Sequence, residues 1–554
     1  MVRCANTAPE YSRIYCYFHT TLGRWEQSPT KSGNADKMKR LVYFFSAFFP
    51  TLLLFFAPSA RAQGTYAAAT CNLSDVSKAI ASEQAKAVDG DLISIPAGSC
   101  SWTSELTATF TKSVTIQGAG AISATTGGTS ITGSDLTVIT DNGGTTSIMA
   151  FTTTSGKSFR ITGIALIGTS NAASGGILDI GGSSSTVRAD HCHIYTTAGA
   201  VGLRIDGSVL GVADHDYFQS PSGANPNNPL AIHNGVDWNG SSEPAPAVGD
   251  HSWADADHFG SSAFFFFEDD AFTQGDIGDA HDGARYVIRH STYTGTHGQM
   301  YNHGLTDARG RSVRAAEIYL NTFTRSVQDG APSYSINSGT LLYWGNTTTN
   351  YRYMVEVDYT RKDNSTYNYG TTPSGWGNCG TNGPTNWDQN TNSSGYACLD
   401  QPGRGAGDLL SGNFPNVVNS TTGTIAWPRQ ALDPIYAWAN TYNDAGYSPE
   451  GILVVDDASL LADNKDYYQQ FGTYGEAGSF NGTKGVGQGL LSARPSTCTV
   501  QVGYWATDTS TLYLCETSNV WTVYYTPYTY PHPLTQSSLG TVPVPPTKLA
   551  AVIN

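Results

Sequence analysis

Charged residues, and basic residues above all, are scarce in this chain. Only 14% of the 554 residues are Asp, Glu, Lys or Arg, and 45 acidic against 30 basic residues give a formal net charge of -15. Nucleic-acid binders are typically basic, so that class is excluded. The chain also lacks an H-E-x-x-H zinc motif, a nucleophile-elbow serine and a glycine-rich phosphate loop with lysine, which excludes the enzymes that depend on these motifs.

Glycine and aromatic residues are abundant instead. The chain contains 60 Gly and 11% aromatic residues, with short β-branched runs between stretches of Gly, Thr, Ser and Asn. A disordered chain would have few aromatic residues, and a helical bundle would be richer in Leu, Glu and Lys. The composition therefore favours many short strands, arranged as a repeat.

The long apolar run of the chain lies near its start. It follows two basic residues, covers residues 41–57 and is followed by small residues up to Ala62. This order is typical of a secretory signal peptide, so we expect residues 1–62 to be a leader whose true start is Met38. An uncleaved membrane anchor is the alternative, and no later segment could span a bilayer. We expect a protein that is secreted, in the periplasm or outside the cell.

The cysteines that follow this leader are spaced as local pairs. Such pairs are compatible with an oxidising compartment. The spacing suggests the pairs Cys71 with Cys100, Cys379 with Cys398, and Cys498 with Cys515, and it leaves Cys192 alone.

A short pattern recurs through the middle of the chain. Each copy has a small polar residue two positions before a mostly bulky apolar residue. Successive copies are about 21 to 30 residues apart, except at two places where longer loops are inserted, and this period fits a solenoid of stacked strands. The copies begin at Asp190, Asp214, Glu268, Arg289, Tyr319, Trp344 and Trp438.

Alternation within a strand predicts which residues of each copy point inward. The residue just before each copy and the residue two positions earlier should face the core, for example Ala189 and Val187, or Ile288 and Tyr286. The third residue of each copy should stack at a turn, where Asn and Asp can satisfy backbone groups. These third residues are Cys192, Asp216, Asp270, Ser291, Asn321, Asn346 and Asn440.

The two ends of the solenoid differ from its middle. Residues 75–87 have a helical apolar pattern that predicts a short helix over the first coil, where it hides an unpaired edge. We expect the solenoid over residues 63–474, with insertions at 219–262 and 360–426. Residues 475–554 form a separate aromatic-rich region, for which packing against the last coil, glycan binding and attachment are all open.

The motifs carry a family resemblance. The stretches "DGDLISIPAGSCSW" and "VTIQGAG", followed by "NTF"-like coils, resemble the pectin-lyase-like superfamily of right-handed parallel β-helices. The resemblance implies an all-β, right-handed parallel β-helix solenoid with an N-terminal capping helix and a small C-terminal region. It leaves the activity open, because this superfamily includes lyases, hydrolases, epimerases, tailspikes and adhesins. A β-propeller or sandwich would need regularly spaced hairpins, which the Asn-Gly pairs do not provide.

The first residues of the copies should form one outward column. Neighbouring coils of a parallel sheet are about 4.8 Å apart, so three acids would stack closely and could hold Ca²⁺. The aromatic residues further along would form a track for sugar rings. An ordinary solvated face is the alternative. The predicted metal ligands are Asp190, Asp214 and Glu268, and the predicted track is Tyr319, Trp344 and Trp438.

Part of this column is similar to pectate lyases, in which Asp side chains hold Ca²⁺ and an Arg takes the proton from C5 of a uronate. Residues 212–215 resemble a family element through Asp214 and His215, although the family's Trp is missing. Residues 309–314 resemble its Arg-rich element, without the family's Pro. The resemblance implies Arg289 as the base, with Arg311 or Arg314 as alternatives, and His215 as a catalytic neighbour.

A second group of polar residues lies between two copies. It includes Arg285 and His303, which we predict to line the rim of a substrate cleft; turn residues bonded to the backbone are the alternative. The sequence thus predicts a polysaccharide-active protein, with three alternatives. These are a Ca²⁺-assisted lyase acting on a uronate-containing glycan, a non-catalytic glycan-binding surface protein, and a glycoside hydrolase. The oligomeric state stays open.

Overall fold

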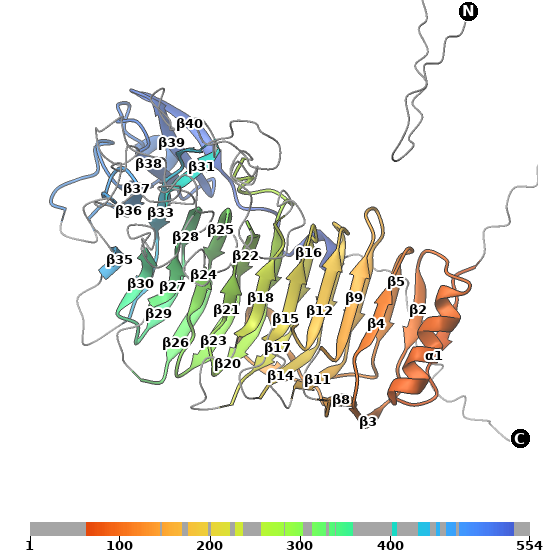
Figure 1. Ribbon diagram of the computed structural model, residues 1–554. Coiled ribbons are helices and arrows are strands. Elements are labelled where there is room, and N and C mark those ends of the chain that lie inside the picture. The colour runs from red at the N-terminus through yellow and green to blue at the C-terminus, as the bar shows by residue number, and fades with distance from the viewer. Residues whose placement is uncertain are drawn as a thin grey trace, which may run out of the picture. The chain divides into compact units, whose positions relative to one another are not determined.

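The protein is a right-handed parallel β-helix. Three parallel sheets, A, B and C, are each built from one strand per coil, and Figure 1 shows these strands stacked from α1 towards the C-terminal sheet. The computed structural model describes residues 62–143, 147–168, 175–197, 201–221, 228–235, 256–281, 283–302, 313–327, 332–337, 339–357, 402–406, 430–443, 450–454, 461–472 and 476–536.

Sheet A has 12 strands and sheets B and C have 10 each, and the chain passes from A to B to C in every full coil. Sheet A contains β1 (Thr65–Ala67), β2 (Asp91–Ser94), β5 (Val114–Gln117), β10 (Phe159–Thr162), β13 (Val187–Asp190), β16 (Gly211–Asp214), β19 (Phe265–Glu268), β22 (Arg285–Arg289), β25 (Ala315–Tyr319), β28 (Thr340–Trp344), β33 (Ile435–Trp438) and β36 (Tyr467–Gln469).

Sheets B and C complete the coils. Sheet B contains β3 (Gly98–Trp102), β8 (Thr137–Asp141), β11 (Ala165–Gly168), β14 (His193–Thr196), β17 (Tyr217–Gln219), β20 (Ala271–Thr273), β23 (Thr292–Gly295), β26 (Thr322–Arg325), β29 (Thr347–Thr349) and β34 (Thr441–Tyr442). Sheet C contains β4 (Leu106–Thr109), β9 (Met149–Thr153), β12 (Leu178–Gly182), β15 (Val201–Asp206), β18 (Asn228–His233), β21 (Gly278–Ala280), β24 (Met300–Asn302), β27 (Pro332–Ile336), β30 (Tyr353–Val357) and β35 (Glu450–Val454).

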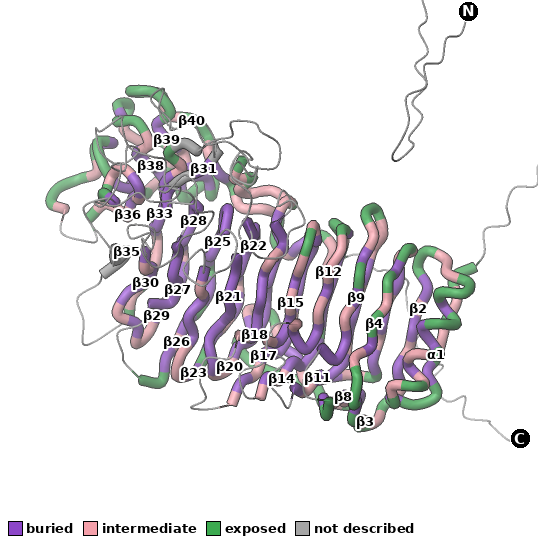
Figure 2. The backbone as a smooth tube through the Cα atoms, in the orientation of Figure 1, coloured by how far each residue is buried: buried purple, intermediate pink, exposed green. Residues whose placement is uncertain are grey.

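The inward positions predicted from alternation are confirmed. One continuous apolar core fills the helix, and the middle coils are buried along nearly their whole length in Figure 2. The sheet A strands of the middle coils, such as β19 and β22, are buried on both faces, which favours branched and aromatic residues. Core members from the predicted positions are Val187, Ala189, Ala213, Phe265, Phe267, Tyr286, Ile288, Ala316, Ile318, Leu341, Tyr343, Ile435 and Ala437.

The predicted ladder at the turn between sheets A and B is also confirmed. From Asp216 onward, each side chain of the ladder accepts a hydrogen bond from the backbone N–H of the coil before it, as Asp216 does from Cys192 at 2.7 Å and Asn346 from Asn321 at 3.1 Å. The residue before each ladder position has a positive φ, for example His215 at 59°. The ladder satisfies the backbone where the chain turns sharply between two sheets.

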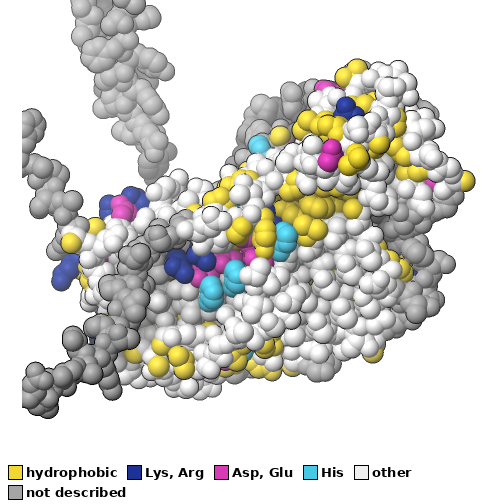
Figure 3. Space-filling model, turned by 180° about the vertical axis from the view of Figure 1, so that it is seen from behind, with side chains coloured by type: hydrophobic (Ala, Val, Ile, Leu, Met, Phe, Trp, Pro, Cys, Tyr) yellow, Lys and Arg dark blue, Asp and Glu magenta, His cyan; other side chains and the backbone are white. Residues whose placement is uncertain are grey.

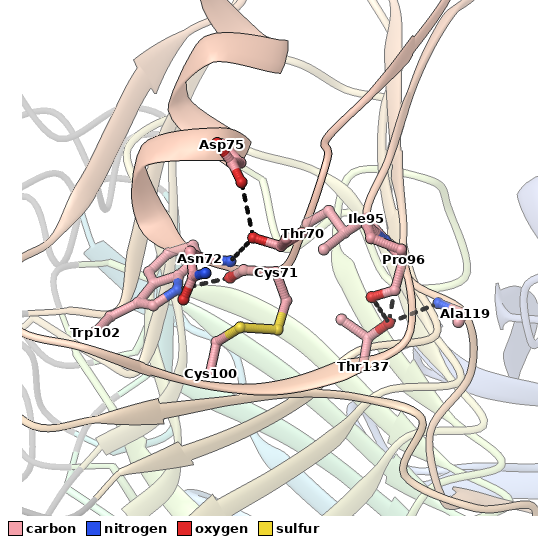
Figure 4. Close-up of a disulfide and its surroundings, with 10 residues drawn as sticks. All are labelled: Thr70, Cys71, Asn72, Asp75, Ile95, Pro96, Cys100, Trp102, Ala119 and Thr137. Atoms are coloured by element: carbon pink, nitrogen blue, oxygen red, sulfur yellow. Dashed lines mark hydrogen bonds between the residues drawn. A yellow bond between two sulfur atoms is a disulfide. The ribbon is translucent and has the colours of Figure 1, made fainter.

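The N-terminal end is closed as predicted. Helix α1 (Leu73–Gln84) turns Val76, Ala79 and Ile80 towards the first coil. A disulfide between Cys71 and Cys100 ties the residues preceding α1 to β3, and Figure 4 shows it beside the turn that starts the helix. The Thr70 hydroxyl donates a hydrogen bond to Asp75, and the Trp102 indole donates to the Cys71 carbonyl oxygen at 2.9 Å.

The long gaps in the repeat are insertions within single coils. Strand β16 pairs directly with β19, and β28 with β33, although the sequence between each pair is much longer than an ordinary coil. The first of these gaps, expected as an insertion over 219–262, contains β18, which belongs to sheet C. Most of the second insertion, with Cys379 and Cys398, lies outside the described residues. Short two-stranded pieces are β6 (Ser123–Ala124) with β7 (Ile131–Thr132), which flank η1 (Thr126–Gly128), and β31 (Arg404–Ala406) with β32 (Gln430–Leu432).

The C-terminal region folds back over the outer face of sheet A. It contains a four-stranded sheet and then residues 526–536, which we call the C-terminal strap. A second apolar cluster joins this region to sheet A through Leu342, Trp344 and Tyr436. Its elements are β37 (Val486–Gly489), η4 (Leu491–Ala493), β38 (Gly503–Ala506), β39 (Thr511–Thr517), β40 (Val520–Tyr525) and α2 (Pro533–Gln536), which lies in the strap.

Two findings bear on the cellular compartment. Disulfides join Cys71 to Cys100 and Cys498 to Cys515, as predicted, while Cys192 is free and buried. Such bonds suggest an oxidising compartment. Within the described ranges, no helix has the length and apolar character needed to cross a membrane.

Candidate functional site

The outward column predicted from the repeat exists. In sheet A, Asp190 lies beside Asp214, Asp214 beside Glu268, and so on through every later copy. The column continues in register through Arg289, Tyr319, Trp344 and Trp438. The repeat therefore aligned the coils correctly over this whole stretch.

The column is not an exposed track, and that expectation is wrong. The side chains of Asp190, Asp214, Glu268 and Arg289 are fully buried, and those of the aromatic members are nearly so. The C-terminal strap covers the middle of the column, where the His532 backbone N–H donates to Glu268 at 2.7 Å. The repeat correctly predicts that these side chains point away from the β-helix core. The C-terminal region covers this outer face of sheet A, so the same side chains are buried between two layers of protein.

Each acid of the column is paired with an arginine on the same outer face. Arg160 makes two hydrogen bonds to Asp190, both at 2.7 Å, and Arg188 makes two to Asp214 at 2.8 and 2.9 Å. Burial alone would raise the pKa of Asp190, but hydrogen bonds from Arg160 and His191 and the nearby charge of Arg188 hold it below its usual value.

The third acid is held in the same way. Arg289 donates to Glu268 through Nε at 2.8 Å and Nη2 at 2.5 Å. Burial raises the pKa of Glu268, and the positive charge of Arg289 opposes that rise. All three acids are thus neutralised by arginine rather than by a metal ion.

These acids do not fit the predicted Ca²⁺ site. A hard cation needs several open oxygen ligands, but both oxygens of Asp190, Asp214 and Glu268 already accept hydrogen bonds. Across the part of the chain that the structure describes, no group of three or more His, Cys, Asp or Glu side chains is arranged to hold a metal ion.

Arg289 has no free donor to offer a substrate. Besides Glu268, its guanidinium donates to the Tyr319 hydroxyl at 2.8 Å and to the backbone oxygens of Tyr528 and Thr529 at 2.8 and 2.9 Å. It is also fully buried. The geometry makes Arg289 the anchor of the strap and removes it as a candidate base.

The other predicted arginines and His303 lie apart from this column or outside the described residues. Arg314 is buried and paired with Asp433 at 3.2 Å. Arg285 is buried, and it donates to the Ala256 carbonyl oxygen at 3.3 Å. Arg311 and His303 are outside the described residues.

The aromatic members of the column form the second core. The Tyr319 and Trp344 rings stack at 4.6 Å between centroids, and Trp344 and Trp438 stack at 5.8 Å. Trp505 of β38 packs against both tryptophans, at 5.0 and 5.4 Å. Trp505 covers these ring faces, so they are not open to a sugar. The aligned rings instead form the surface against which the C-terminal sheet packs.

Among the predicted catalytic residues that the structure describes, His215 alone is partly exposed. Its Nδ1 lies 3.0 Å from a carboxylate oxygen of Asp214, and its side chain is 23% exposed. The hydrogen bond to Asp214 is the main reason why the pKa of His215 lies above its usual value. His191 repeats the same arrangement one coil earlier, with Asp190 at 2.9 Å.

A pocket on a different face of the β-helix was not predicted from the sequence. It has a volume of about 540 Å³ and lies on the outer side of sheet C, near the N-terminal end. Its lining residues come from four successive strands and from α1. They are Gln84, Thr107, Ala108, Thr109, Ala150, Phe151, Thr152, Asp179, Gly181, Gly182 and Asp206.

Two carboxyl groups in this pocket differ in their surroundings. Burial raises the pKa of Asp179 to about 6; Arg204 opposes the rise, and the charges of Asp206 and Glu105 add to it. Asp206 is 43% exposed and accepts hydrogen bonds from Arg204 at 3.0 Å and from the Gly207 backbone at 2.9 Å. Asp179 is thus suited to hold its proton up to a higher pH than an ordinary carboxyl group. Asp206 accepts two hydrogen bonds, as an ionised carboxylate can.

The sequence did contain a signal for this pair. Leu178 pairs with Leu203 and Ile180 with Ile205, so Asp179 and Arg204 share one outward row of sheet C. Extending the repeat from the sheet A strands to the third strand of each coil would have placed Asp179 and Asp206 on one face. No family model, no curated protein and no solved structure matches this chain, so its function is inferred from the fold and from these side chains.

Proposed function

We propose that the protein is a glycoside hydrolase that cleaves a glycan in the sheet C pocket, with Asp179 as general acid and Asp206 as general base. The observation that carries the proposal is the pair of carboxyl groups beside one pocket, of which Asp179 has a pKa raised to about 6. Glycoside hydrolysis needs this division of labour between two carboxyl groups.

The spacing of the pair supports an inverting reaction. Asp206 lies one coil beyond Gly181, since a Cβ added at Gly181 would meet the Asp206 Cβ at 3.9 Å. Asp179 is two residues before Gly181 on the same strand. One coil of ~4.8 Å and two residues of ~3.3 Å each place the Cα atoms of Asp179 and Asp206 about 8 Å apart, and carboxyl groups that project from the same face at that spacing suit inverting enzymes, in which they are ~6.5–9.5 Å apart.

The chemistry of the pocket favours a neutral glycan. Asp179 and Asp206 would repel the carboxylates of a uronate chain, whereas Gln84, Thr107 and Thr109 offer hydrogen bonds to sugar hydroxyls. Gly181 and Gly182 leave the pocket floor without side chains, so that a ring can approach the backbone. The β-helix fold and the motifs quoted above also support membership of the pectin-lyase-like superfamily, and the disulfides support secretion.

Asp179→Asn and Asp206→Asn are each expected to lower kcat/KM at least about 100-fold, because general acid–base catalysis typically contributes that much or more. The measurement is the release of reducing ends from a panel of neutral and acidic polysaccharides, with the anomeric form of the product read by NMR. Asp75→Asn, a change of an exposed carboxylate at α1, is the control and should leave the rate unchanged. Products with an unsaturated sugar end, or full activity in Asp179→Asn, would contradict the proposal.

The pH profile should show the protonation state of Asp179. A general acid must carry its proton, and burial raises the pKa of Asp179 to about 6. We therefore expect kcat/KM to fall as the pH rises through about 6, and the measurement is the initial rate between pH 4 and 8. A rate that rises over the same interval would rule out Asp179 as the acid.

Gly181→Val tests the site without touching a carboxyl group. The new side chain has room, because the Asp206 Cβ at 3.9 Å is the nearest atom to an added Cβ, but it fills the pocket floor. Substrate binding should weaken about tenfold or more while the midpoint of thermal unfolding stays within a few degrees. Thr115→Val, at an outward position of sheet A, is the matched control. Equal binding by the two variants would place the glycan elsewhere.

A further inference from the structure

Two copies of one side-chain unit lie at the turn between sheets A and B. Each unit contains an arginine, a fully buried aspartate and a histidine: Arg160, Asp190 and His191 in one coil step, and Arg188, Asp214 and His215 in the next. An ionised carboxylate only accepts hydrogen bonds, so Nδ1 of each histidine carries the proton of the shared bond. The other ring nitrogen, Nε2, is the one that each histidine can offer to a ligand.

The two imidazole rings are held side by side. Their planes differ by 1° and their centroids are 5.2 Å apart. Because the rings are parallel and equally bonded, their Nε2 atoms face the same way, at a separation of ~5 Å that follows the coil spacing. The side chains of His191 and His215 are 48% and 23% exposed, and no hydrogen bond joins either Nε2 to another described residue.

The backbone at this turn does not call for histidine. His191 and His215 have φ values of 52° and 59°, a region that favours glycine. Other coils place glycine here, as at Gly163 with φ 68° and at Gly345, or other residue types, and the later coils have Asp269, His290, Leu320 and Ala439 with φ between 51° and 60°. Holding two non-glycine residues there costs conformational free energy, and such positions are common at binding sites.

The charges around the pair leave room for an anion. Arg160 and Arg188 neutralise Asp190 and Asp214. Of two further acids on this side, Glu268 is paired with an arginine, whereas Asp269 is bonded only to neutral donors. Glu268 is bonded to Arg289, and Asp269 accepts hydrogen bonds from the Tyr530 hydroxyl at 2.8 Å and the Gly127 backbone at 2.7 Å.

The histidines of the strap and of the following coils, and Tyr530, add no further charge. Burial lowers the pKa of His532 and of His290 to about 4, and it raises the pKa of Tyr530 above its usual value. These three groups are therefore neutral at neutral pH. Figure 3 shows histidine, acidic and basic side chains gathered in one patch on this side of the protein. The negative charge of Asp269, one coil beyond His215, has no cationic partner among the described residues and helps to raise the pKa of His215. With both histidines protonated, the two units carry two net positive charges and Asp269 offsets one of them, so one positive charge remains for an anion.

We propose that His191 and His215 together bind one oxygen anion, a carboxylate or a sulfate, through their two protonated Nε2 atoms. An anion in front of the two Nε2 atoms can accept one hydrogen bond of ~2.8 Å from each Nε2–H, each on a different oxygen, because the two N–H bonds point the same way. The buried aspartates fix both rings in the orientation that this needs. The source is either a small free anion or the acidic group of a glycan, and the site is separate from the sheet C pocket.

The test is a titration of the full chain with inorganic sulfate, followed through the Cε1–H signals of its histidines by NMR at pH 5.5 and pH 8. We expect sulfate to shift the His191 and His215 signals together at pH 5.5, and to bind about tenfold or more weakly at pH 8, because an imidazole loses positive charge as the pH rises. His191→Gln and His215→Gln should each lose this binding. His258→Gln, also at a positive φ of 62°, is the matched control and should keep it.

A second titration separates the two sources. A uronate oligomer that displaces sulfate and binds more tightly than a single uronic acid assigns the site to an acidic glycan, and equal binding by the two assigns it to a small anion. The proposal is overturned if sulfate leaves both histidine signals unchanged at pH 5.5, if binding is equal at the two pH values, or if both Gln variants bind normally. Hydrolysis that depends on Asp179 should be intact in His191→Gln. Loss of hydrolysis and loss of anion binding are therefore measured separately, and each tests only one of the two proposals.

Discussion

Arg289→Ala is expected to lower the free energy of unfolding by about 3–5 kcal/mol, because removing one partner of a buried ion pair leaves the other charge buried and unpaired. Glu268 would lose both of its arginine hydrogen bonds in a place with no access to water. The strap would lose the guanidinium that binds the Tyr528 and Thr529 carbonyl oxygens. Urea denaturation followed by tryptophan fluorescence measures the change.

Two variants control this result. Arg204→Ala breaks a pair that is partly exposed on both sides, so it should cost no more than about 1 kcal/mol. Replacing Arg289 and Glu268 together by methionine removes both charges, and it should recover much of the stability that Arg289→Ala loses. If Arg289→Ala and Arg204→Ala were equally stable, the pair would not hold the strap.

Asp216→Asn and Asp270→Asn are expected to stabilise the protein at pH 7. Complete burial, with the charge of neighbouring acids, raises the pKa of both carboxyl groups well above the usual value. In the unfolded chain these groups ionise near pH 4, so folding at pH 7 requires them to take up protons. That requirement lowers the free energy of unfolding progressively as the pH rises above about 4, and asparagine removes it.

The ladder itself shows that asparagine fits. Asn321 and Asn346 occupy equivalent positions, and each donates through Nδ2 to a backbone carbonyl oxygen at 2.8 Å. The second carboxyl oxygens of Asp216 and Asp270 have no hydrogen-bond partner among the described residues. We expect the midpoint of thermal unfolding to rise by ~2–4 °C or more at pH 7 and to be unchanged near pH 3.

The reverse substitution is the matched control. Asn346→Asp should lower the midpoint at pH 7 and have little effect near pH 3, since it adds a carboxyl group to the same buried row. A midpoint in Asp216→Asn or Asp270→Asn that falls at pH 7 would show that the carboxyl groups contribute a hydrogen bond that an amide cannot replace.

The repeat allowed most of the fold to be predicted. One residue of each copy sets the register of the whole coil, because strands in a parallel stack pair residue by residue, and the column from Asp190 to Trp438 is in register as expected. The cap at α1 and the turn ladder followed from the same pattern. These features are local, or they repeat at a fixed period, and both kinds of signal are visible in a sequence.

The covering of the column could not be predicted in this way. Arg289 meets Thr529, and Glu268 meets His532, across more than 200 residues, and no period relates the strap to the coils. An outward row of Tyr and Trp looks the same in a sequence whether it binds sugar or a second layer of protein. The sequence did contain one signal that the acids of the column are paired. Arg188 lies two residues before Asp190 in β13, and an arginine on the same face as a row of acids pairs with them.

The strap also sets an order of events during synthesis. Residues 526–536 leave the ribosome long after Glu268 and Arg289, and a solenoid otherwise folds coil by coil as it emerges. Until the strap has been synthesised, the outer face of sheet A stays in contact with water and its ion pairs are solvated. The middle coils can therefore form early, but their outer face is buried only after residues 486–536 have been synthesised, and a chain truncated before Val486 would keep its β-helix and expose Trp344 and Trp438.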